Sequence, residues 1–324
     1  MNSDSLKRVD QPVVSVIVIT YNSSRYVLDT LESIKNQTYK NIELIISDDC
    51  SSDHTVSLIE KWVHKNSSRF TSVAIVKSSN NSGIAFNCNR GLLASKGDWV
   101  KLIAGDDILF ENAIEKLLDY TSQTKDCNVL FGRIKYLKDD VLIDDEIPEI
   151  FRLNQKKQTI RNLKGSSIKA PSSFLRRQTL IDIGGFDENY PMIEDVPMWI
   201  KLSFSGNTFH FVDIFIAKYR IHNNNISIST NRNGAFIDIR FYKEQENMLR
   251  NLIIPGLYRE NQFFSLMAKL NYIFVTRIIL LMGNKNDILS KLTSFLVIEN
   301  SITKVKRFPK FLNRFINKQM PKLL

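Results

Sequence analysis

Four short apolar runs alternate with amphipathic segments over the first 110 residues. The runs are 13–20 (VVSVIVIT), 42–47 (IELIIS), 73–76 and 99–103. Continuous runs rich in β-branched residues are typical of strands that are buried on both faces. After the first run, apolar residues recur at helical spacing at Val27, Leu31 and Ile34. This alternation predicts an α/β fold with a mostly parallel, Rossmann-like sheet flanked by helices.

Polar or acidic residues follow three of these predicted strands. They are Tyr21-Asn22, Asp48-Asp49 and Asp106-Asp107. In open α/β sheets, ligands bind beyond the carboxyl ends of the strands, so these residues are expected at one edge. Two adjacent aspartates are suited to a hard divalent cation such as Mg²⁺ or Mn²⁺. The alternative is that Asp106 and Asp107 form a turn or cap a helix that starts near Glu111.

The alternation weakens after residue 111. The pattern predicts a helix around 114–118, strands at 129–136 and 209–219, and a basic, irregular and mobile loop at 152–170. From about residue 235 onward the chain is expected to be helical. The domain organisation expected is therefore a polar tail at 1–12, one α/β domain at 13–230 and a helical, basic C-terminal region at 231–324.

Net charge changes the picture more than the other bulk properties do. The chain has a formal charge of +10, which favours an anionic partner such as a nucleic acid, a membrane surface or a phosphate-bearing substrate. Its three cysteines, odd in number and widely spaced, predict neither a disulfide framework nor a zinc site. We expect no secretory signal at the polar N-terminus. The apolar run 272–282 is expected to be too short to span a bilayer.

Several motifs occur in a characteristic order between residues 13 and 222. They are VSVIVITYN at 14–22, SDDCSSDHT at 47–55, NSG at 81–83, KGDWVKLIAGDD at 96–107, GGFDE at 184–188 and ED at 194–195. This ordered set resembles the inverting, nucleotide-sugar-dependent glycosyltransferases of family 2. The resemblance implies the GT-A fold, with a nucleotide-binding half at about 13–110 and an acceptor half at about 111–230.

The resemblance also assigns roles on the donor side. Tyr21 and Asn22 would line the base pocket, and Asp49 would accept a hydrogen bond from uracil. Asp106 and Asp107 would approach the ribose and hold Mn²⁺ or Mg²⁺ on the diphosphate. Two positions depart from the family pattern. Ala104 replaces the first carboxylate of the usual acidic triplet, and Cys88 stands where an arginine is common, which leaves the role of Arg90 open.

On the acceptor side, the resemblance makes Asp195 the catalytic base and gives Glu194 the task of orienting the acceptor. Because Asp195 is expected at a helix start, the helix dipole should lower its pKa; the alternative is that it only caps that helix. In related enzymes a histidine in the region of His222 joins the metal or the diphosphate. A structural or solvated histidine remains the alternative there.

These roles imply transfer of a hexose, glucose or galactose, from a uridine diphosphate (UDP) sugar to a sugar hydroxyl. The expected acceptor is a lipid-diphosphate-linked sugar of bacterial O-antigen or capsular polysaccharide biosynthesis. The alternatives are a nucleotidyltransferase, or a catalytically inactive sugar- or lipid-binding protein of the same fold. A nucleotidyltransferase is expected to have a glycine-rich basic loop after its first strand, where this chain has YNSSRY.

The C-terminal region predicts contact with an anionic membrane surface. No acidic residue follows Glu299, and the seven basic residues beyond it are interleaved with aromatic and aliphatic ones. They are Lys304, Lys306, Arg307, Lys310, Arg314, Lys318 and Lys322. This composition is typical of an interfacial helix on anionic lipid. We therefore expect a cytoplasmic protein, peripheral on the inner face of the bacterial membrane, with no nucleic-acid partner; its oligomeric state is left open.

Overall fold

The computed structural model describes residues 11–222, 238–284, 290, 293, 294 and 296. The chain divides into two compact units, Met1–Asn225 and Ile226–Leu324. The expected basic residues between Lys304 and Lys322 lie outside the described part.

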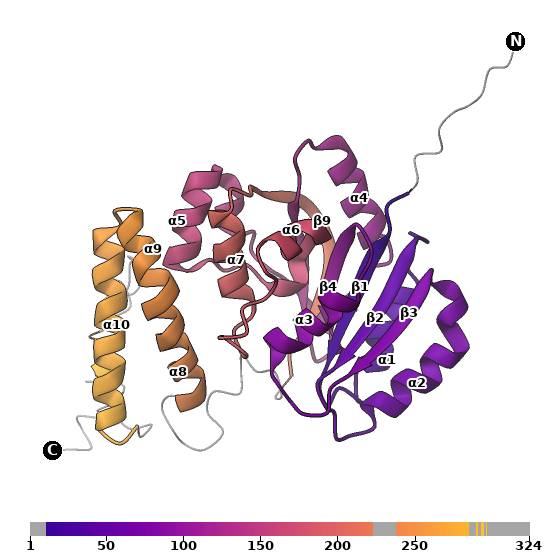
Figure 1. Ribbon diagram of the computed structural model, residues 1–324, viewed down its shortest axis with the longest axis horizontal. Helices are drawn as coiled ribbons and strands as arrows, with labels where there is room; N and C mark the ends of the chain where they lie inside the picture. The colour runs from indigo at the N-terminus through magenta and orange to yellow at the C-terminus, as the bar shows by residue number, and fades with distance from the viewer. Residues whose placement is uncertain (1–10, 223–237, 285–289, 291–292, 295, 297–324) are drawn as a thin grey trace, which may run out of the picture. The chain divides into compact units, whose positions relative to one another are not determined.

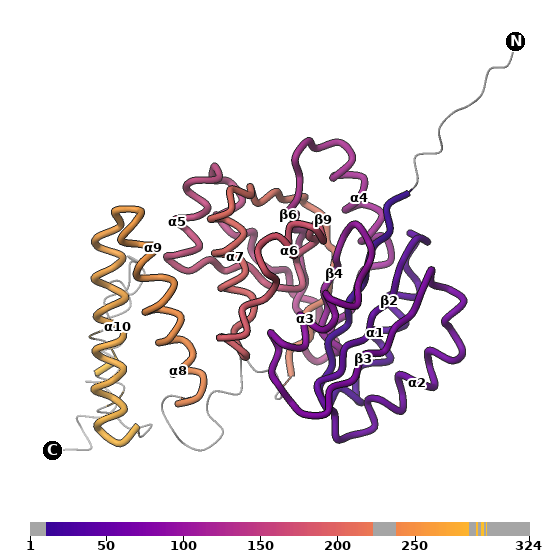
Figure 2. The backbone as a smooth tube through the Cα atoms, viewed as in Figure 1, coloured from indigo at the N-terminus to yellow at the C-terminus, as the bar shows by residue number. Residues whose placement is uncertain are grey.

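A mixed sheet forms the centre of the first unit. Its described strands are β1 (Val14–Thr20), β2 (Ile42–Asp48), β3 (Ser72–Lys77), β4 (Trp99–Ala104), β5 (Ile108–Leu109), β6 (Val129–Lys138), β7 (Val141–Asp144), β8 (Ser173–Arg176) and β9 (Phe209–Arg220). Their order is β3-β2-β1-β4-β8-β6-β9-β5, and β7 pairs with β6. Strands β3, β2, β1 and β4 are parallel, which confirms the α/β alternation expected for the first 110 residues. The trace in Figure 2 follows this alternation through the indigo and purple part of the chain.

Helices cover both faces of the sheet (Figure 1). Those of the first unit are α1 (Val27–Lys35), α2 (Thr55–Asn66), α3 (Ile84–Ala94), α4 (Ala113–Gln123), α5 (Gln155–Gly165), α6 (Arg177–Asp182) and α7 (Asp195–Phe204). Successive strand residues point to opposite faces. Val16 and Val18 of β1 therefore pack in a core with α1, α2 and α4, while Ile17 packs in a second core with α3, α6 and α7. The buried strands thus join two apolar layers.

The parallel strands end level with one another, which positions the functional loops. Thr20 of β1 pairs with Asp48 of β2, and Ile19 pairs with Ala104 of β4. The residues that follow β1, β2 and β4 consequently leave the sheet at the same edge. Strand β9 pairs antiparallel with β5, and its last residue, Arg220, also reaches this edge.

The expectation of a mobile loop at 152–170 was wrong. Helix α5 occupies Gln155–Gly165, and the side chain of Asn154 caps it by accepting a hydrogen bond from the backbone N–H of Lys157. The buried positions of this helix are mostly polar, namely Gln158, Thr159 and Asn162 beside Leu163. An apolar periodicity cannot reveal such a helix.

The second unit is helical in its described part, as expected. It contains α8 (Ile239–Met248), a π-helix η4 (Leu249–Ile253), α9 (Ile254–Arg259) and α10 (Phe263–Leu281). Helix α10 has 19 residues and is long and apolar enough to cross a membrane, although a core helix of a soluble protein meets the same criterion. The expectation concerned the apolar run 272–282 alone. Helix α10 begins nine residues before that run, so the run underestimates the length of the apolar helix.

Candidate active site

Asp49 lies in a cradle of donors just beyond β2. Its carboxylate accepts hydrogen bonds from the backbone N–H groups of Ser82, at 3.1 Å, and Gly83, at 2.8 Å. The guanidinium group of Arg90 forms an ion pair with the same carboxylate. Gly83 has a φ of 99°, and a Cβ there would lie 2.7 Å from Pro191 Cβ, so the loop requires glycine. The side chain of Asp49 is almost fully buried, and these contacts fix its orientation.

Arg90 belongs to helix α3 and extends this cradle. It also donates to the side-chain oxygen of Asn87, at 3.2 Å, and its buried Nε atom has no hydrogen-bond partner among the described residues. Asn87 in turn donates to the backbone oxygen of Thr20, at 3.2 Å. Helix α3 therefore contacts the end of β1 through Asn87 and the residue after β2, Asp49, through Arg90. Sequence reasoning left Arg90 without a role, and the structure pairs it with the predicted uracil-binding aspartate.

Tyr21 and Asn22 follow β1 directly. Tyr21 is half exposed at the sheet edge. Asn22 has a φ of 50°, a left-handed conformation that asparagine tolerates better than most residues. Its backbone N–H donates to Ser51 Oγ, at 2.8 Å, and its side chain accepts from the N–H of Ser52, at 2.9 Å. Asn22 therefore ties the loops after β1 and β2 together, while Tyr21 is free to contact a ligand.

Asp106 and Asp107 follow β4 but have different surroundings. Asp106 Oδ2 lies 2.9 Å from His222 Nε2, and both side chains are about one-fifth exposed. Asp107 is buried, and its Oδ1 accepts the backbone N–H of Arg220 at 2.9 Å. Burial, reinforced by the neighbouring charge of Asp106, raises the pKa of Asp107 well above its usual range. The structure thus brings Asp106 and His222 together and directs Asp107 to the end of β9.

These residues offer a partial set of metal ligands. In the described part of the chain, no group of three or more His, Cys, Asp or Glu side chains is arranged to hold a metal ion. The carboxylate of Asp106 and the imidazole of His222 are an oxygen and a nitrogen ligand, a pair that suits Mn²⁺. The two side chains could hold such a cation only if a bound diphosphate and water supplied its remaining ligands.

Three residues that sequence reasoning missed surround Asp106 and His222, namely Arg220, Asp29 and Tyr26. Arg220 donates from Nε to the backbone oxygen of Asp106 and from its terminal nitrogen to Asp29, both at 2.9 Å. Its guanidinium lies 4.5 Å from the ring centroid of Tyr26, and the ring of His222 stacks on Tyr26 at 5.0 Å. Arg220 directly follows the predicted strand 209–219, and a position at a strand end is a signal that could have identified it.

Glu194 and Asp195 stand at the start of α7. The backbone N–H of Val196 donates to Asp195 Oδ1 at 2.7 Å. Burial raises the pKa of Asp195, and this effect outweighs the opposing effects of backbone hydrogen bonds and of Lys169. The expectation that the helix start lowers this pKa was therefore wrong. Asp195 also does not cap the helix, since it is the first helical residue and Glu194 holds the cap position.

Helix α3 links the two predicted halves of the site. Its Arg90 binds Asp49, while its Cys88 lies close enough to Glu194 and Asp195 for both carboxylates to raise the pKa of the thiol, after burial as the main cause. Arg90 opposes this effect. Cys88 is fully buried among apolar side chains, as expected for a small hydrophobic residue.

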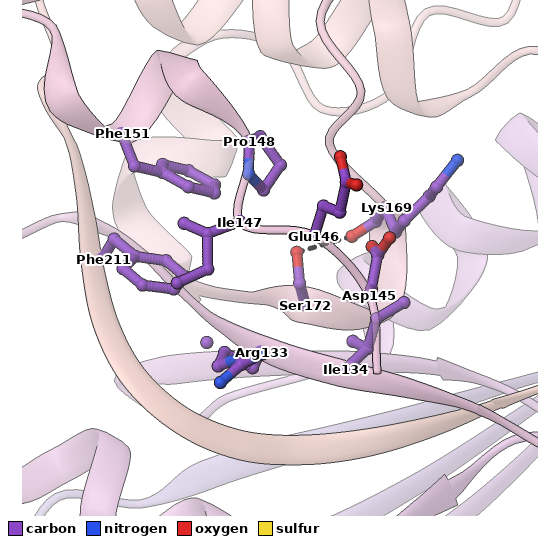
Figure 3. Close-up of a pocket in the computed structure, with 11 residues that line it drawn as sticks. Arg133, Ile134, Asp145, Glu146, Ile147, Pro148, Phe151, Lys169, Ser172 and Phe211 are labelled. Carbon is purple, nitrogen blue, oxygen red and sulfur yellow. Dashed lines mark hydrogen bonds between the residues drawn. The ribbon is translucent and has the colours of Figure 1, made fainter. Parts of the chain in front are cut away.

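A small cavity of about 20 Å³ is lined by residues of β6, β9 and the segment 145–151, together with Lys169 and Ser172 (Figure 3). Phe151 and Phe211 form its aromatic end, and the side chain of Lys169 extends away from them. The backbone oxygen of Lys169 accepts a hydrogen bond from Ser172 Oγ at 2.7 Å. Lys169 lines this cavity, and its positive charge also lowers the pKa of Asp195. The cavity itself has room for about one water molecule.

Comparison with known proteins agrees with this geometry. A model of the family described as "Glycosyl transferase family 2" matches residues 15–184. An uncharacterized glycosyltransferase of Methanocaldococcus jannaschii is 26% identical over 217 residues, which are 66% of this chain and 73% of that protein. The putative teichuronic acid biosynthesis glycosyltransferase TuaG of Bacillus subtilis is 28% identical over 219 residues, covering 67% and 82% respectively.

A solved structure shares the fold. The S. aureus TarS fragment 1–349, crystallised with UDP-GlcNAc, superposes with a TM-score of 0.63 at 19% identity, covering 87% of this chain and 78% of the fragment. This likeness confirms the expected GT-A fold. The family model spans Asp49, Arg90, Asp106 and Asp107, and it ends ten residues before Glu194. Because it covers just over half of the chain, the protein belongs to glycosyl transferase family 2.

Proposed function

We propose that this family 2 glycosyltransferase transfers a hexose, glucose or galactose, from a UDP-sugar to a sugar hydroxyl with inversion at the anomeric carbon. The acceptor proposed is a lipid-diphosphate-linked sugar in the biosynthesis of a bacterial surface polysaccharide such as an O-antigen. A relative described as acting in teichuronic acid biosynthesis and a structural neighbour crystallised with UDP-GlcNAc support this class of reaction.

One observation carries the proposal. Helix α3 holds Asp49 through Arg90 on one side and lies beside Glu194 and Asp195 on another. A carboxylate suited to a base ring and a carboxylate suited to proton abstraction are therefore positioned by a single rigid element. Transfer between two bound substrates requires this kind of mutual placement.

The donor side binds and orients. Asp49, with its orientation fixed by the backbone N–H groups of Ser82 and Gly83, would accept a hydrogen bond from the uracil N–H. The exposed ring of Tyr21 would lie against the base. Asp106 and His222 would hold a divalent cation, which supplies positive charge to the diphosphate leaving group when bound.

The acceptor side moves a proton. Asp195, whose pKa is raised by burial, takes the proton from the acceptor hydroxyl as that oxygen forms its bond to the anomeric carbon. The bond from that carbon to the diphosphate oxygen breaks, and UDP leaves with the electron pair. A base with a raised pKa serves this step better because proton abstraction is most effective when the pKa lies nearer the working pH.

The test is a panel of UDP-glucose, UDP-galactose and UDP-GlcNAc with Mn²⁺, read first as a shift in melting temperature and then as UDP release. A ligand that binds the folded state raises the melting temperature. Asp49→Asn should remove the shift, and Asp119→Asn, on an exposed turn of α4, is the matched control. Stabilisation by nucleoside triphosphates and not by any UDP-sugar would favour the nucleotidyltransferase instead, and binding without turnover would favour an inactive binding protein.

A further inference from the structure

Helix α10 carries an exposed apolar stripe along one side. Its members are Phe263, Phe264, Met267, Leu270, Phe274 and Leu281. Apart from Phe264, they recur at intervals of three, four or seven residues, which places them on one face of a helix. Phe264 is 85% exposed and Leu281 is 87% exposed. Contiguous apolar surface of this kind marks a contact site on a protein or a membrane.

The opposite face of α10 packs on helix α8. Tyr272, on that face, donates a hydrogen bond to Gln245 at 2.7 Å. Arg277 lies beside the stripe, three residues after Phe274, and forms an ion pair with Glu246 of α8 at 2.6 Å. Helix α8 also carries Arg240, Lys243 and Glu244. If α10 crossed the membrane, these charges would be drawn into the hydrocarbon layer, where charged side chains are strongly unfavourable. The pairing with α8 therefore favours a helix that lies along a surface.

Charge distinguishes a membrane from a second copy of this chain. Helix α10 contains two basic residues, Lys269 and Arg277, and no acidic ones, and the sequence 300–324 beyond it has seven basic residues and no acid. Two such chains repel each other, whereas an anionic lipid surface attracts them. Pairing two stripes would also bury the Arg277–Glu246 pair, which a lipid headgroup layer leaves hydrated.

We propose that the exposed stripe of α10 lies in the plane of an anionic membrane surface, with its phenylalanines inserted among the lipid headgroups and α8 on the aqueous side. The biological reason for this binding rests on the proposed function, since a lipid-linked acceptor would be held at that surface. The binding itself involves no sugar and can be measured independently of turnover.

The test is co-flotation of the full-length protein with vesicles of phosphatidylglycerol mixed with phosphatidylcholine, compared with phosphatidylcholine alone. The variant Phe264→Gln/Phe274→Gln changes two exposed side chains and keeps good helix formers at both positions. Its apparent affinity for anionic vesicles should fall by about tenfold or more, since each phenylalanine loses favourable burial in the headgroup layer. The matched control is Leu93→Gln, which changes an 83% exposed apolar residue of α3.

The outcomes separate the possibilities. Weak flotation of the double variant, full flotation of Leu93→Gln and release of the wild type by alkaline carbonate support the proposal. Resistance to carbonate would show a spanning helix and overturn it. Equal flotation of wild type and double variant would also overturn it, as would a wild-type dimer that the variant dissociates without any lipid binding. UDP release with a soluble acceptor should be unchanged in the double variant, so failure of this inference leaves the proposed reaction standing.

Discussion

Asp195 has a raised pKa because burial outweighs the lowering effects of backbone hydrogen bonds and of the Lys169 charge. In the unfolded chain its pKa is lower, so at neutral pH the ionised carboxylate reduces the free energy of unfolding. This penalty is present above the folded pKa and disappears as the pH falls below the unfolded pKa. A buried carboxylate that lowers the free energy of unfolding at neutral pH favours a functional role for Asp195 over a stabilising one.

We predict that Asp195→Asn lowers the transfer rate by about 10²–10⁴-fold, as loss of a general base does. The melting temperature at pH 7 should be unchanged or slightly higher, because the buried charge is removed. Initial rates and thermal melts at one pH measure both effects. The wild-type rate should also decline, as the pH is lowered, at a higher pH than an ordinary aspartate pKa would give.

Glu194→Gln is the matched control for Asp195, since it changes the adjacent carboxylate at the cap position. It should lower the rate less if Glu194 only orients the acceptor. If Asp195→Asn keeps more than about a tenth of wild-type turnover, the range expected for loss of a base is not reached. The base would then lie elsewhere, with Asp187 and Glu188 next to be tested.

A second prediction at the residue scale concerns which of the two aspartates after β4 binds the metal ion. Asp106 faces His222, while Asp107 is buried against the end of β9. We therefore predict that Asp106→Asn and His222→Gln weaken Mn²⁺ binding, and that Asp107→Asn does so less. Equilibrium dialysis with Mn²⁺ and UDP measures affinity without turnover. A larger loss of affinity in Asp107→Asn than in Asp106→Asn would make Asp107 the principal ligand.

At the scale of elements, the sequence predicts what local pattern determines and misses what distant contacts determine. Strands β1, β2 and β4 follow from their apolar runs, because those residues are buried on both faces. Helix α5 does not follow, since its buried residues Gln158, Thr159 and Asn162 are accommodated by hydrogen bonds to Phe209, Ser203 and Trp199. The partners lie 37 to 51 residues away, so no local pattern contains them.

The same division applies to the candidate site. The resemblance located the residues after each strand, and alignment of strand ends brings their loops to one edge. It did not reveal the bond between Asp107 and Arg220, which joins residues 113 positions apart, or the pairing of Arg90 with Asp49. Whether a carboxylate is exposed or buried depends on such contacts, and so does the sign of its pKa shift.

Lys101 joins strand β4 to the segment that leads into β8. This lysine of β4 is fully buried, and its Nζ donates to the backbone oxygens of Pro171, at 2.6 Å, and Ser173, at 3.1 Å. Burial lowers its pKa to about 7. The amine therefore connects β4 to the 3₁₀ helix η3 (Ala170–Ser172) and to β8.

We predict that Lys101→Met lowers the free energy of unfolding by about 1–3 kcal/mol, because it leaves buried carbonyl oxygens without a donor. Between pH 7 and about 10 the unfolded chain binds more protons at Lys101 than the folded chain, so wild-type stability at this site rises with pH. The stability difference between wild type and variant should widen over this range. Denaturant titrations at pH 7 and pH 9 measure it, and a constant difference would contradict the depressed pKa.

At the scale of the whole molecule, the first unit contains every residue of the candidate site. Asp49, Asp106, Asp195 and His222 all precede Asn225, and both apolar cores of the sheet are built from residues before that point. The described second unit instead supplies the exposed stripe of α10. Donor recognition and surface attachment are therefore expected to be separable properties of the chain.

We predict that a chain ending at Asn225 binds UDP with an affinity within about twofold of the full-length protein, because every residue of the candidate site belongs to the first unit and independent sites couple by only about 0.5 kcal/mol. Calorimetric titration of UDP with Mn²⁺ measures both affinities, and circular dichroism establishes that the shortened chain is folded. Flotation of the shortened chain with anionic vesicles should be lost at the same time, since α10 is removed. A folded shortened chain that no longer binds UDP would show that residues after Asn225 contribute to the nucleotide site, and the division between donor recognition and attachment would then be wrong.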